Sequence, residues 1–219
     1  MAKSAIFLDC NDVLNIKADY LHKIEDLRLL PEVATAIRKL NDLNLFCCLV
    51  SNQSGPAQNY YPLSHVDALH ERLCQLLYSQ AQAKLDAFYY CPYLSPTAGG
   101  TNPEFTGWST WRKPNTGMLV AAAWEYNLNL QQSFVIGDKS ADIDLAHNVG
   151  AKGILVQTER SKKVSVNTLR FPRGNLIPAP SALKNKRHLT RPDYIAHNLI
   201  EAVGWICDVL NLSKSHSQF

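Results

Sequence analysis

The chain of 219 residues contains no uninterrupted run of eighteen apolar residues, so it predicts no transmembrane helix. The apolar run after Lys3 has only the length of a strand, and no small-residue cleavage site follows it, which argues against a secretory signal. Neither an internal repeat nor a linker divides the chain. We therefore expect one domain over residues 1–219 with a full core, in a cytoplasmic protein that does not bind membranes.

The cysteines show no CxxC pair and no histidine at a metal-ligand spacing. There are six of them, Cys10, Cys47, Cys48, Cys74, Cys91 and Cys207. Five lie in apolar patterns typical of strands or helices, where a buried and reduced thiol is the common role. The sequence therefore predicts neither disulfides nor a thiol nucleophile.

Positive charge is concentrated in one segment. Residues 160–191 hold nine Lys or Arg and no Asp or Glu, although the net charge of the chain is only +3. The rest of the chain has 22 minus 9, or 13, basic residues against 19 acidic ones. With Pro172, Pro178 and Pro180 and little periodicity, residues 160–192 predict a long basic loop that is either solvated or placed to attract an anionic substrate.

Short apolar runs alternate with amphipathic stretches through residue 156. The predicted strands are residues 5–8, 45–50, 86–91, 133–137 and 153–156. The predicted helices begin at Pro31 and at Asn115 or Thr116, and cover residues 63–80, 141–149 and about 194–210. Right-handed crossovers between such elements give an α/β fold with a single, doubly wound, Rossmann-like parallel sheet flanked by helices.

Polar side chains follow several predicted strands. Asp9 follows the first strand, Ser51 the second and Asp138 the fourth, while Lys113 precedes a helix. Each has a plain structural interpretation, as a cap, a turn residue or a surface charge. The carboxyl ends of parallel strands meet at one edge, however, where open α/β sheets bind ligands. Two carboxylates suit Mg²⁺ and a lysine suits a phosphate, so their convergence favours a functional site.

Four segments that contain these residues resemble the four motifs of the haloacid dehalogenase (HAD) superfamily. They are Asp9-x-Asn11, Ser51-Asn52-Gln53, Arg112-Lys113-Pro114 and Gly137-Asp138-Lys139-x-x-Asp142. From residue 5 to about 157 the chain is most similar to the small capless phosphatases of that superfamily, which act on histidinol phosphate or D-glycero-D-manno-heptose 1,7-bisphosphate. The resemblance implies a HAD-type fold without a large cap domain.

The resemblance also implies the roles of the chemical groups. Asp9 would attack phosphorus and carry the phosphoryl group as an aspartyl phosphate. Mg²⁺ would bind Asp9, the backbone carbonyl of Asn11 and Asp138. Ser51 and Lys113 would hold the phosphate, because phosphoryl transfer depends mostly on positioning and electrostatics.

Two further residues complete the predicted phosphate site. Asn52 belongs to a polar turn that can offer donors to an anion, and Arg112 precedes the phosphate-binding lysine.

The chain departs from the family pattern at Asn11. The phosphatases carry a second Asp there as general acid and base, and an amide cannot give or take that proton. Such groups contribute typically about 10²- to 10⁴-fold, so hydrolysis should be slow unless another group, such as Asp12, substitutes. The alternative to an enzyme is therefore a catalytically weakened homologue that serves as a phospholigand-binding protein or as a regulatory protein.

A second departure concerns zinc, which the related phosphatases hold with Cys-x-His and Cys-x-Cys pairs. The corresponding residues are Cys91-Pro92-Tyr93 and Ser109-Thr110-Trp111, which retain one ligand of four. We predict no structural zinc, and expect Tyr93, Trp108 and Trp111 to hold this loop by apolar packing.

The sequence thus predicts a Mg²⁺-dependent phosphomonoester hydrolase whose partner is a small phosphorylated metabolite, such as a sugar phosphate or histidinol phosphate. Arg-Lys-Pro-Asn-Thr-Gly-Met at 112–118 also resembles the third motif of polynucleotide phosphatases, and the basic loop could contact a nucleic-acid backbone. A polynucleotide 3'-phosphatase is therefore a further alternative. The connection Tyr20-Leu21-His22 matches the sugar-phosphate branch better. The sequence does not predict an oligomeric state.

Overall fold

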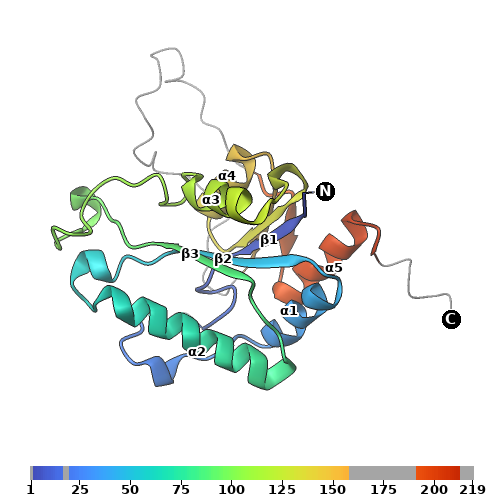
Figure 1. The fold of residues 1–219 in the computed structure, drawn as a ribbon, viewed down its shortest axis with the longest axis horizontal. Coiled ribbons are helices and arrows are strands. Elements are labelled where there is room, and N and C mark those ends of the chain that lie inside the picture. The colour runs from blue at the N-terminus through green and yellow to red at the C-terminus, as the bar shows by residue number, and fades with distance from the viewer. Residues whose placement is uncertain (1, 17–19, 158–190, 213–219) are drawn as a thin grey trace, which may run out of the picture.

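A six-stranded parallel sheet in the order β3-β2-β1-β4-β5-β6 forms the centre of the computed structural model, which describes residues 2–16, 20–157 and 191–212 (Figure 1). The strands are β1 (Ala5–Leu8), β2 (Phe46–Asn52), β3 (Ala87–Cys91), β4 (Phe134–Gly137), β5 (Lys152–Val156) and β6 (Tyr194–Ala196). The chain moves outward from β1 to β3 and then from β4 to β6. The sheet is therefore doubly wound, and its switch point, where such sheets bind ligands, lies between β1 and β4.

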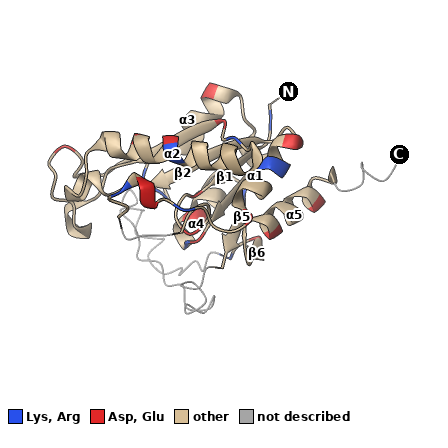
Figure 2. Ribbon diagram, turned by 90° about the horizontal axis from the view of Figure 1, so that it is seen from below, with Lys and Arg blue, Asp and Glu red and all other residues tan. Residues whose placement is uncertain are grey.

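Helices cover both faces of the sheet. They are α1 (Val33–Asp42), α2 (Leu63–Ala81), α3 (Gly117–Tyr126), α4 (Ser140–Asn148) and α5 (Leu199–Val209). One face packs against α1, α2 and α5, and the other against α3 and α4 (Figure 1). Acidic residues occur on α4 and on α5, so negative charge is spread over both faces (Figure 2). No cap domain stands apart from this sheet in the described residues.

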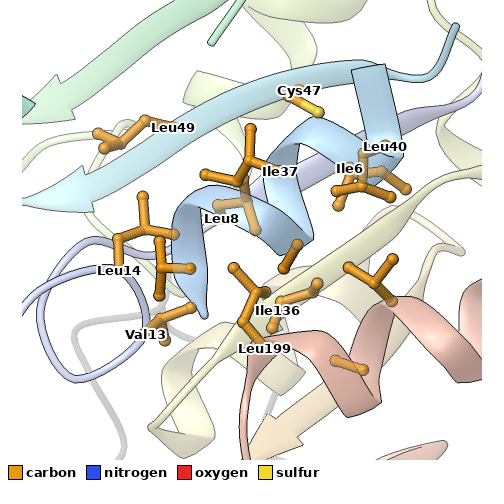
Figure 3. Packing of buried hydrophobic residues seen from close by; sticks show 14 of the residues in the cluster. Ile6, Leu8, Val13, Leu14, Ile37, Leu40, Cys47, Leu49, Ile136 and Leu199 are labelled. Carbon is orange, nitrogen blue, oxygen red and sulfur yellow. The ribbon is translucent and has the colours of Figure 1, made fainter. Parts of the chain in front are cut away.

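The first strand is buried on both sides, as its apolar run predicts. Ile6 and Leu8 point to the larger core and face Ile37 and Leu40 of α1 (Figure 3). Phe7 points to the smaller core on the opposite face. Full burial of one such side chain stabilises the fold by about 1.5–3 kcal/mol. The buried side chains of β1 therefore fix the position of Asp9, the residue that follows the strand.

The predicted elements before residue 157 are present, with ends within two residues of those expected. The prediction of a helix over 194–210 was wrong at its start, because residues 194–196 form the sixth strand and α5 begins at Leu199. The Asp193 carboxylate accepts from the Gly153 backbone N–H at 2.8 Å and so aligns β6 with β5. The Asn198 side chain accepts from the Glu201 N–H at 3.0 Å. This contact caps the amino end of α5, so the helix begins after Asn198 and not at residue 194.

Three further expectations concern membrane helices, the basic loop and the cysteines. In the parts of the chain that the structure describes, no helix is both long and apolar enough to cross a bilayer. Residues 160–190 of the predicted basic loop lie outside the described residues. All six cysteines are free thiols, and five of them are buried.

Candidate active site

Asp9 stands at the carboxyl end of β1, next to the switch point of the sheet. Its backbone N–H donates to the Ile136 carbonyl at 2.9 Å, which continues the ladder between β1 and β4 by one residue. The side chain is buried. Burial opposes ionisation, but the nearby ammonium groups of Lys113 and Lys139 outweigh it and hold the pKa of Asp9 below its usual range. The Asp9 carboxylate therefore stays ionised, as its predicted role of nucleophile requires.

Lys113 is buried beside Asp9 and is satisfied by three oxygen atoms. Its Nζ lies 2.8 Å from Asp9 Oδ1 and 2.6 Å from Asp142 Oδ1, and it donates to the Val50 carbonyl at 3.0 Å. Burial alone would lower the pKa of this lysine, but the two carboxylates raise it. Lys113 thus places a fixed positive charge next to the Asp9 carboxylate.

The first turn of α4 brings Asp142 against the end of β4. Asp142 Oδ2 accepts from the Lys139 backbone N–H at 3.1 Å, and its other oxygen holds Lys113. This approach requires glycine at position 137, because a Cβ atom there would lie 2.2 Å from the Asp142 Cβ. Gly137 therefore lets a helix residue reach the strand-end site.

Three carboxylates form a group that fits a metal ion. Oxygen atoms of Asp9, Asp138 and Asp142 lie within 4.8 Å of one another. Lys139 Nζ lies 3.0 Å from Asp138 Oδ1 and 3.8 Å from Asp9 Oδ2, so two ammonium groups, those of Lys113 and Lys139, face three acids. Burial and the Asp9 carboxylate raise the pKa of Asp138 to about 7. Without a cation, ionisation of Asp138 beside the other two carboxylates is thus unfavourable. A hard divalent cation would stabilise the ionised form of Asp138.

The sequence predicted roles for Asp9, Lys113 and Asp138 but none for Asp142 or Lys139. Both lie in the segment Gly-Asp-Lys-x-x-Asp, where position 142 falls one helical turn after the strand end. That spacing was the available signal. Asp142 is more deeply buried than Asp138, and it contacts Lys113 directly.

Ser51 and Asn52 stand at the end of β2 and make different contacts. Ser51 is buried and accepts from Gln53 Nε2 at 3.1 Å. Asn52 pairs with the backbone of Lys113: its Oδ1 accepts from the Lys113 N–H at 3.0 Å and its Nδ2 donates to the carbonyl at 3.3 Å. Its amide therefore positions Lys113, and phosphate binding by Asn52 or Ser51 stays a prediction.

Arg112 precedes Lys113 in the chain and bonds to two other segments, the loop after β3 and the loop after β2. Its Nη1 donates to Tyr93 O at 2.8 Å and to Ser54 Oγ at 3.0 Å. Burial lowers the pKa of this arginine. Arg112 lines the cavity described next, as its predicted role requires, although its contact with phosphate stays a prediction.

A cavity of about 320 Å³ joins the charged groups to a less polar wall. Asp9, Lys113, Lys139 and Asp142 line one part of it, together with Arg112. The remaining lining includes residues of the 11–30 connection and of α2, namely Asn11, Asn15, Tyr20, Leu21, Leu27, Leu69 and His70. This volume is within the range of small-molecule sites.

Asn11 reaches this cavity, as its predicted place requires. Its side-chain Oδ1 accepts from Asn15 Nδ2 at 3.2 Å. Asp12, considered as a substitute acid and base, has a left-handed backbone with φ of 61° and does not line the cavity.

The loop after β3 is held by apolar and aromatic contacts. Tyr93 packs edge-on against Phe105, with ring centres 5.9 Å apart, and Trp111 packs against Tyr89 at 5.7 Å. Trp108, by contrast, is 53% exposed. Tyr93 and Trp111 therefore make ring contacts at this loop, with Phe105 as an additional partner that the sequence did not indicate.

Comparisons with known proteins agree with this geometry. A family model of HAD-hydrolase-like proteins matches residues 110–202. The D-glycero-D-manno-heptose-1,7-bisphosphate 7-phosphatase of Thermosynechococcus vestitus is 51% identical over 207 residues, which cover 94% of this chain and 97% of that protein.

Solved structures show the same relationship. The crystal structure of a HAD-like phosphatase from Mesorhizobium loti is 33% identical, with a TM-score of 0.67, over 72% of this chain and 74% of that one. The D,D-heptose 1,7-bisphosphate phosphatase of B. bronchiseptica, complexed with magnesium and phosphate, has a TM-score of 0.70 at 24% identity, over 94% and 99% of the two chains.

The 51% identity extends over nearly the full length of both chains, and the four motif segments meet around one cavity. The chain therefore belongs to the haloacid dehalogenase superfamily, as one of its capless phosphatases.

Proposed function

We propose that this chain is a Mg²⁺-dependent phosphatase of a small sugar phosphate, with D-glycero-D-manno-heptose 1,7-bisphosphate as the leading candidate substrate. The substrate class is taken from the names of the relatives, above all the one that is 51% identical. The observation that carries the proposal is the ionised Asp9 carboxylate, held 2.8 Å from Lys113 in a cavity large enough for such a ligand. Histidinol phosphate is a second substrate to test.

Asp9 would act as the nucleophile in two displacements. In the first, an Asp9 oxygen bonds to phosphorus while the bond from phosphorus to the sugar oxygen breaks, and the sugar oxygen takes up a proton from solvent. In the second, a water oxygen bonds to phosphorus and gives up a proton to solvent, while the bond from Asp9 to phosphorus breaks and releases the Asp9 carboxylate and inorganic phosphate. Lys113 stays beside both the nucleophile and the transferring group, so its charge is already in place when negative charge develops.

The metal site would use the carboxylates of Asp9 and Asp138 and the backbone carbonyl of Asn11. When bound, Mg²⁺ neutralises phosphoryl oxygens and holds them in position for the displacement. Asp142 lies in the same carboxylate group, and its ion pair with Lys113 keeps that ammonium directed at the site.

The phosphate oxygens would be held by Ser51, Lys113 and Arg112, with Asn52 fixing the lysine through its backbone. Structural zinc is not part of the proposal. Elemental analysis of the purified protein should find less than stoichiometric zinc, since the described loop after Cys91 packs through aromatic and apolar side chains.

The alternative of a weakened homologue that only binds its phosphorylated ligand rests on Asn11. A relative named as a phosphatase at 51% identity makes the enzyme the better supported proposal.

Steady-state release of phosphate tests the proposal. The panel would contain heptose 1,7-bisphosphate, histidinol phosphate and a 3'-phosphorylated oligonucleotide, each with Mg²⁺ or with EDTA. Asp9→Asn keeps the shape of the side chain but removes the nucleophile, and we expect it to lower kcat by more than about 10³-fold.

The matched control is Asp42→Asn, the same change in an exposed pair with Arg38, which should keep full activity. Saturable binding of the sugar phosphate without any release of phosphate would identify a binding protein instead.

A further inference from the structure

Two connections of the chain form the less polar wall of the cavity, and they are bonded to each other. The connection after β1 contributes Tyr20 and Leu21 to the lining, and the connection before α2 contributes Tyr61. His65 Nε2 donates to the Leu21 carbonyl at 2.8 Å, and the Tyr20 hydroxyl accepts from Gln58 Nε2. These contacts give the wall a defined shape without a cap domain.

The ring of Tyr61 lies against Gly55, in the turn that follows β2. A Cβ atom at Gly55 would lie 2.1 Å from Tyr61 Cζ and 2.4 Å from both Cε2 and the hydroxyl oxygen. These are its three nearest atoms, so the tyrosine ring is the first obstacle to a side chain there. The backbone of Gly55, with φ of −55° and ψ of −45°, is one that alanine adopts readily. Glycine at this position therefore makes room for the Tyr61 ring.

The Tyr61 hydroxyl is free to bond to a ligand. In the part of the chain that the structure describes, no hydrogen bond to this hydroxyl is found. Burial raises the pKa of Tyr61 to about 12, so the hydroxyl keeps its proton. Tyr61 thus offers the cavity an apolar ring and a hydrogen-bond donor.

The lining of the cavity divides by charge. The Asp, Lys and Arg side chains that line it are those of Asp9, Arg112, Lys113, Lys139 and Asp142. The less polar wall consists of Tyr20, Leu21, Leu27, Tyr61, Leu69 and His70. It carries no charge at neutral pH, because burial lowers the pKa of His70 to about 4. A phosphoryl group belongs with the cations, so the rest of the substrate meets the uncharged wall.

We propose that Tyr61 determines specificity in this cavity by packing against the C–H face of a single cyclic sugar and donating a hydrogen bond to one of its hydroxyl groups. The inference rests on the proposed function and names the part of the substrate that the uncharged wall holds. The heptose of the leading candidate substrate closes into such a ring. Gly55 is a positioning residue, because it acts only through the place of the Tyr61 ring.

Binding without turnover tests this contact. In the Asp9→Asn protein, calorimetry with Mg²⁺ would measure the Kd of glucose 6-phosphate, glycerol 3-phosphate and inorganic phosphate. The two esters are both phosphates of a primary alcohol, but only glucose 6-phosphate has a ring. We expect glucose 6-phosphate to bind more tightly than glycerol 3-phosphate by about tenfold or more.

Adding Tyr61→Ala should weaken the binding of glucose 6-phosphate by about tenfold, and that of the other two ligands by less than about twofold. Tyr61→Phe keeps the ring and removes the hydroxyl, so it should weaken glucose 6-phosphate by about two- to tenfold. The matched control is Tyr78→Ala on α2. Tyr78 is 66% exposed and does not line the cavity, so no Kd should change.

The place of the ring has its own test in Gly55→Ala. The added methyl group would displace the Tyr61 ring and should weaken glucose 6-phosphate by about three- to tenfold. In the Tyr61→Ala background the obstacle is gone, and Gly55→Ala should change the Kd by less than about twofold. A purely structural role of Gly55 would weaken binding equally in both backgrounds.

The outcomes separate this inference from the function beneath it. Equal Kd values for the two esters, or equal weakening of all three ligands by Tyr61→Ala, would overturn the inference and leave a phosphatase. Failure of inorganic phosphate to bind, together with absence of turnover in the wild type, would overturn the proposed function, and the inference with it. If Tyr61→Ala does not fold, Tyr61→Phe decides, since an unchanged Kd of glucose 6-phosphate would contradict the proposed hydrogen bond.

Discussion

Lys113 connects the two carboxylates at the centre of the site, and the free energy of the fold depends on that connection. Both Asp9 and Asp142 are buried, and each depends on this ammonium for neutralisation. A buried ion pair contributes little net stability compared with apolar residues of the same size. Removing one partner, however, leaves buried charge without compensation. The same residue therefore serves the stability of the fold and, in the proposed function, catalysis.

We predict that Lys113→Met destabilises the fold by about 3–5 kcal/mol and abolishes turnover, because methionine keeps most of the volume but leaves two buried acids facing each other. Urea denaturation with an unchanged m-value would measure the loss. Lys84→Met is the control, since Lys84 is exposed and pairs only loosely with Asp86, at 3.9 Å. Equal stability of the Lys113 and Lys84 variants would contradict the prediction.

At the scale of elements, the close approach of β4 and α4 builds half of the site. The chain turns from Gly137 through Asp138 and Lys139 directly into the helix, and Asp142 folds back on the strand end. The hydrogen bond from the Lys139 N–H to Asp142 caps the amino end of α4. The same Asp142 side chain also contacts Lys113, so one residue both begins the helix and lines the site.

Gly137→Ala should disrupt this turn, because its Cβ would lie 2.2 Å from both the Cβ and Cγ of Asp142. We expect a loss of about 1–3 kcal/mol from overpacking, together with a strong loss of kcat as Asp142 and Lys113 separate.

Gly204→Ala in α5 is the matched control, since nothing lies within 4 Å of the added atom. Alanine there should be neutral or stabilise the helix by about 0.5–1 kcal/mol. Thermal denaturation and phosphate release, measured on both variants, would check the contrast. A Gly137→Ala protein with normal kcat would contradict the prediction, because Asp142 would then keep its contact with Lys113 despite the added methyl group.

For the whole molecule, β6 and α5 complete the larger core, which β1 and α1 begin. The chain returns at β6 beside β5, and α5 then packs on the same face as α1. Trp205 stacks on Tyr194 of β6 with ring centres 5.0 Å apart and meets Phe134 of β4 edge-on at 6.1 Å. The Trp205 side chain thus links α5 to β4, which pairs with β1, the strand that Asp9 follows.

Trp205→Ala should lower the free energy of unfolding by about 2–4 kcal/mol, since it empties a contact shared by α5, β6 and β4. Because Trp205 does not line the cavity, kcat at a permissive temperature should change little.

The control is Trp124→Ala on α3, whose side chain is 88% exposed, and whose loss should change stability by less than about 0.5 kcal/mol. Chemical denaturation of both variants gives the comparison. Similar losses for the two tryptophans would contradict the proposed link.

The sequence predicted five of the six strands and the shared edge to which they carry polar residues. Periodicity and apolar runs are properties of consecutive residues, so β1 and its terminal Asp9 could be recognised without a structure. The strand Tyr194–Ala196 could not, because three residues carry too little pattern and its pairing with β5 is a contact across distant sequence.

By itself, then, the sequence determined the doubly wound sheet, the family, and the place of Asp9, Ser51, Lys113 and Asp138 near one edge. Tertiary structure alone decided which partners these residues take. Examples are Asp142 on Lys113, the Asn52 amide on the Lys113 backbone, and the direction of the Asn11 amide. The physical reason is that a hydrogen bond or ion pair depends on positions within a few tenths of an ångström, and packing of segments far apart in the chain sets those positions.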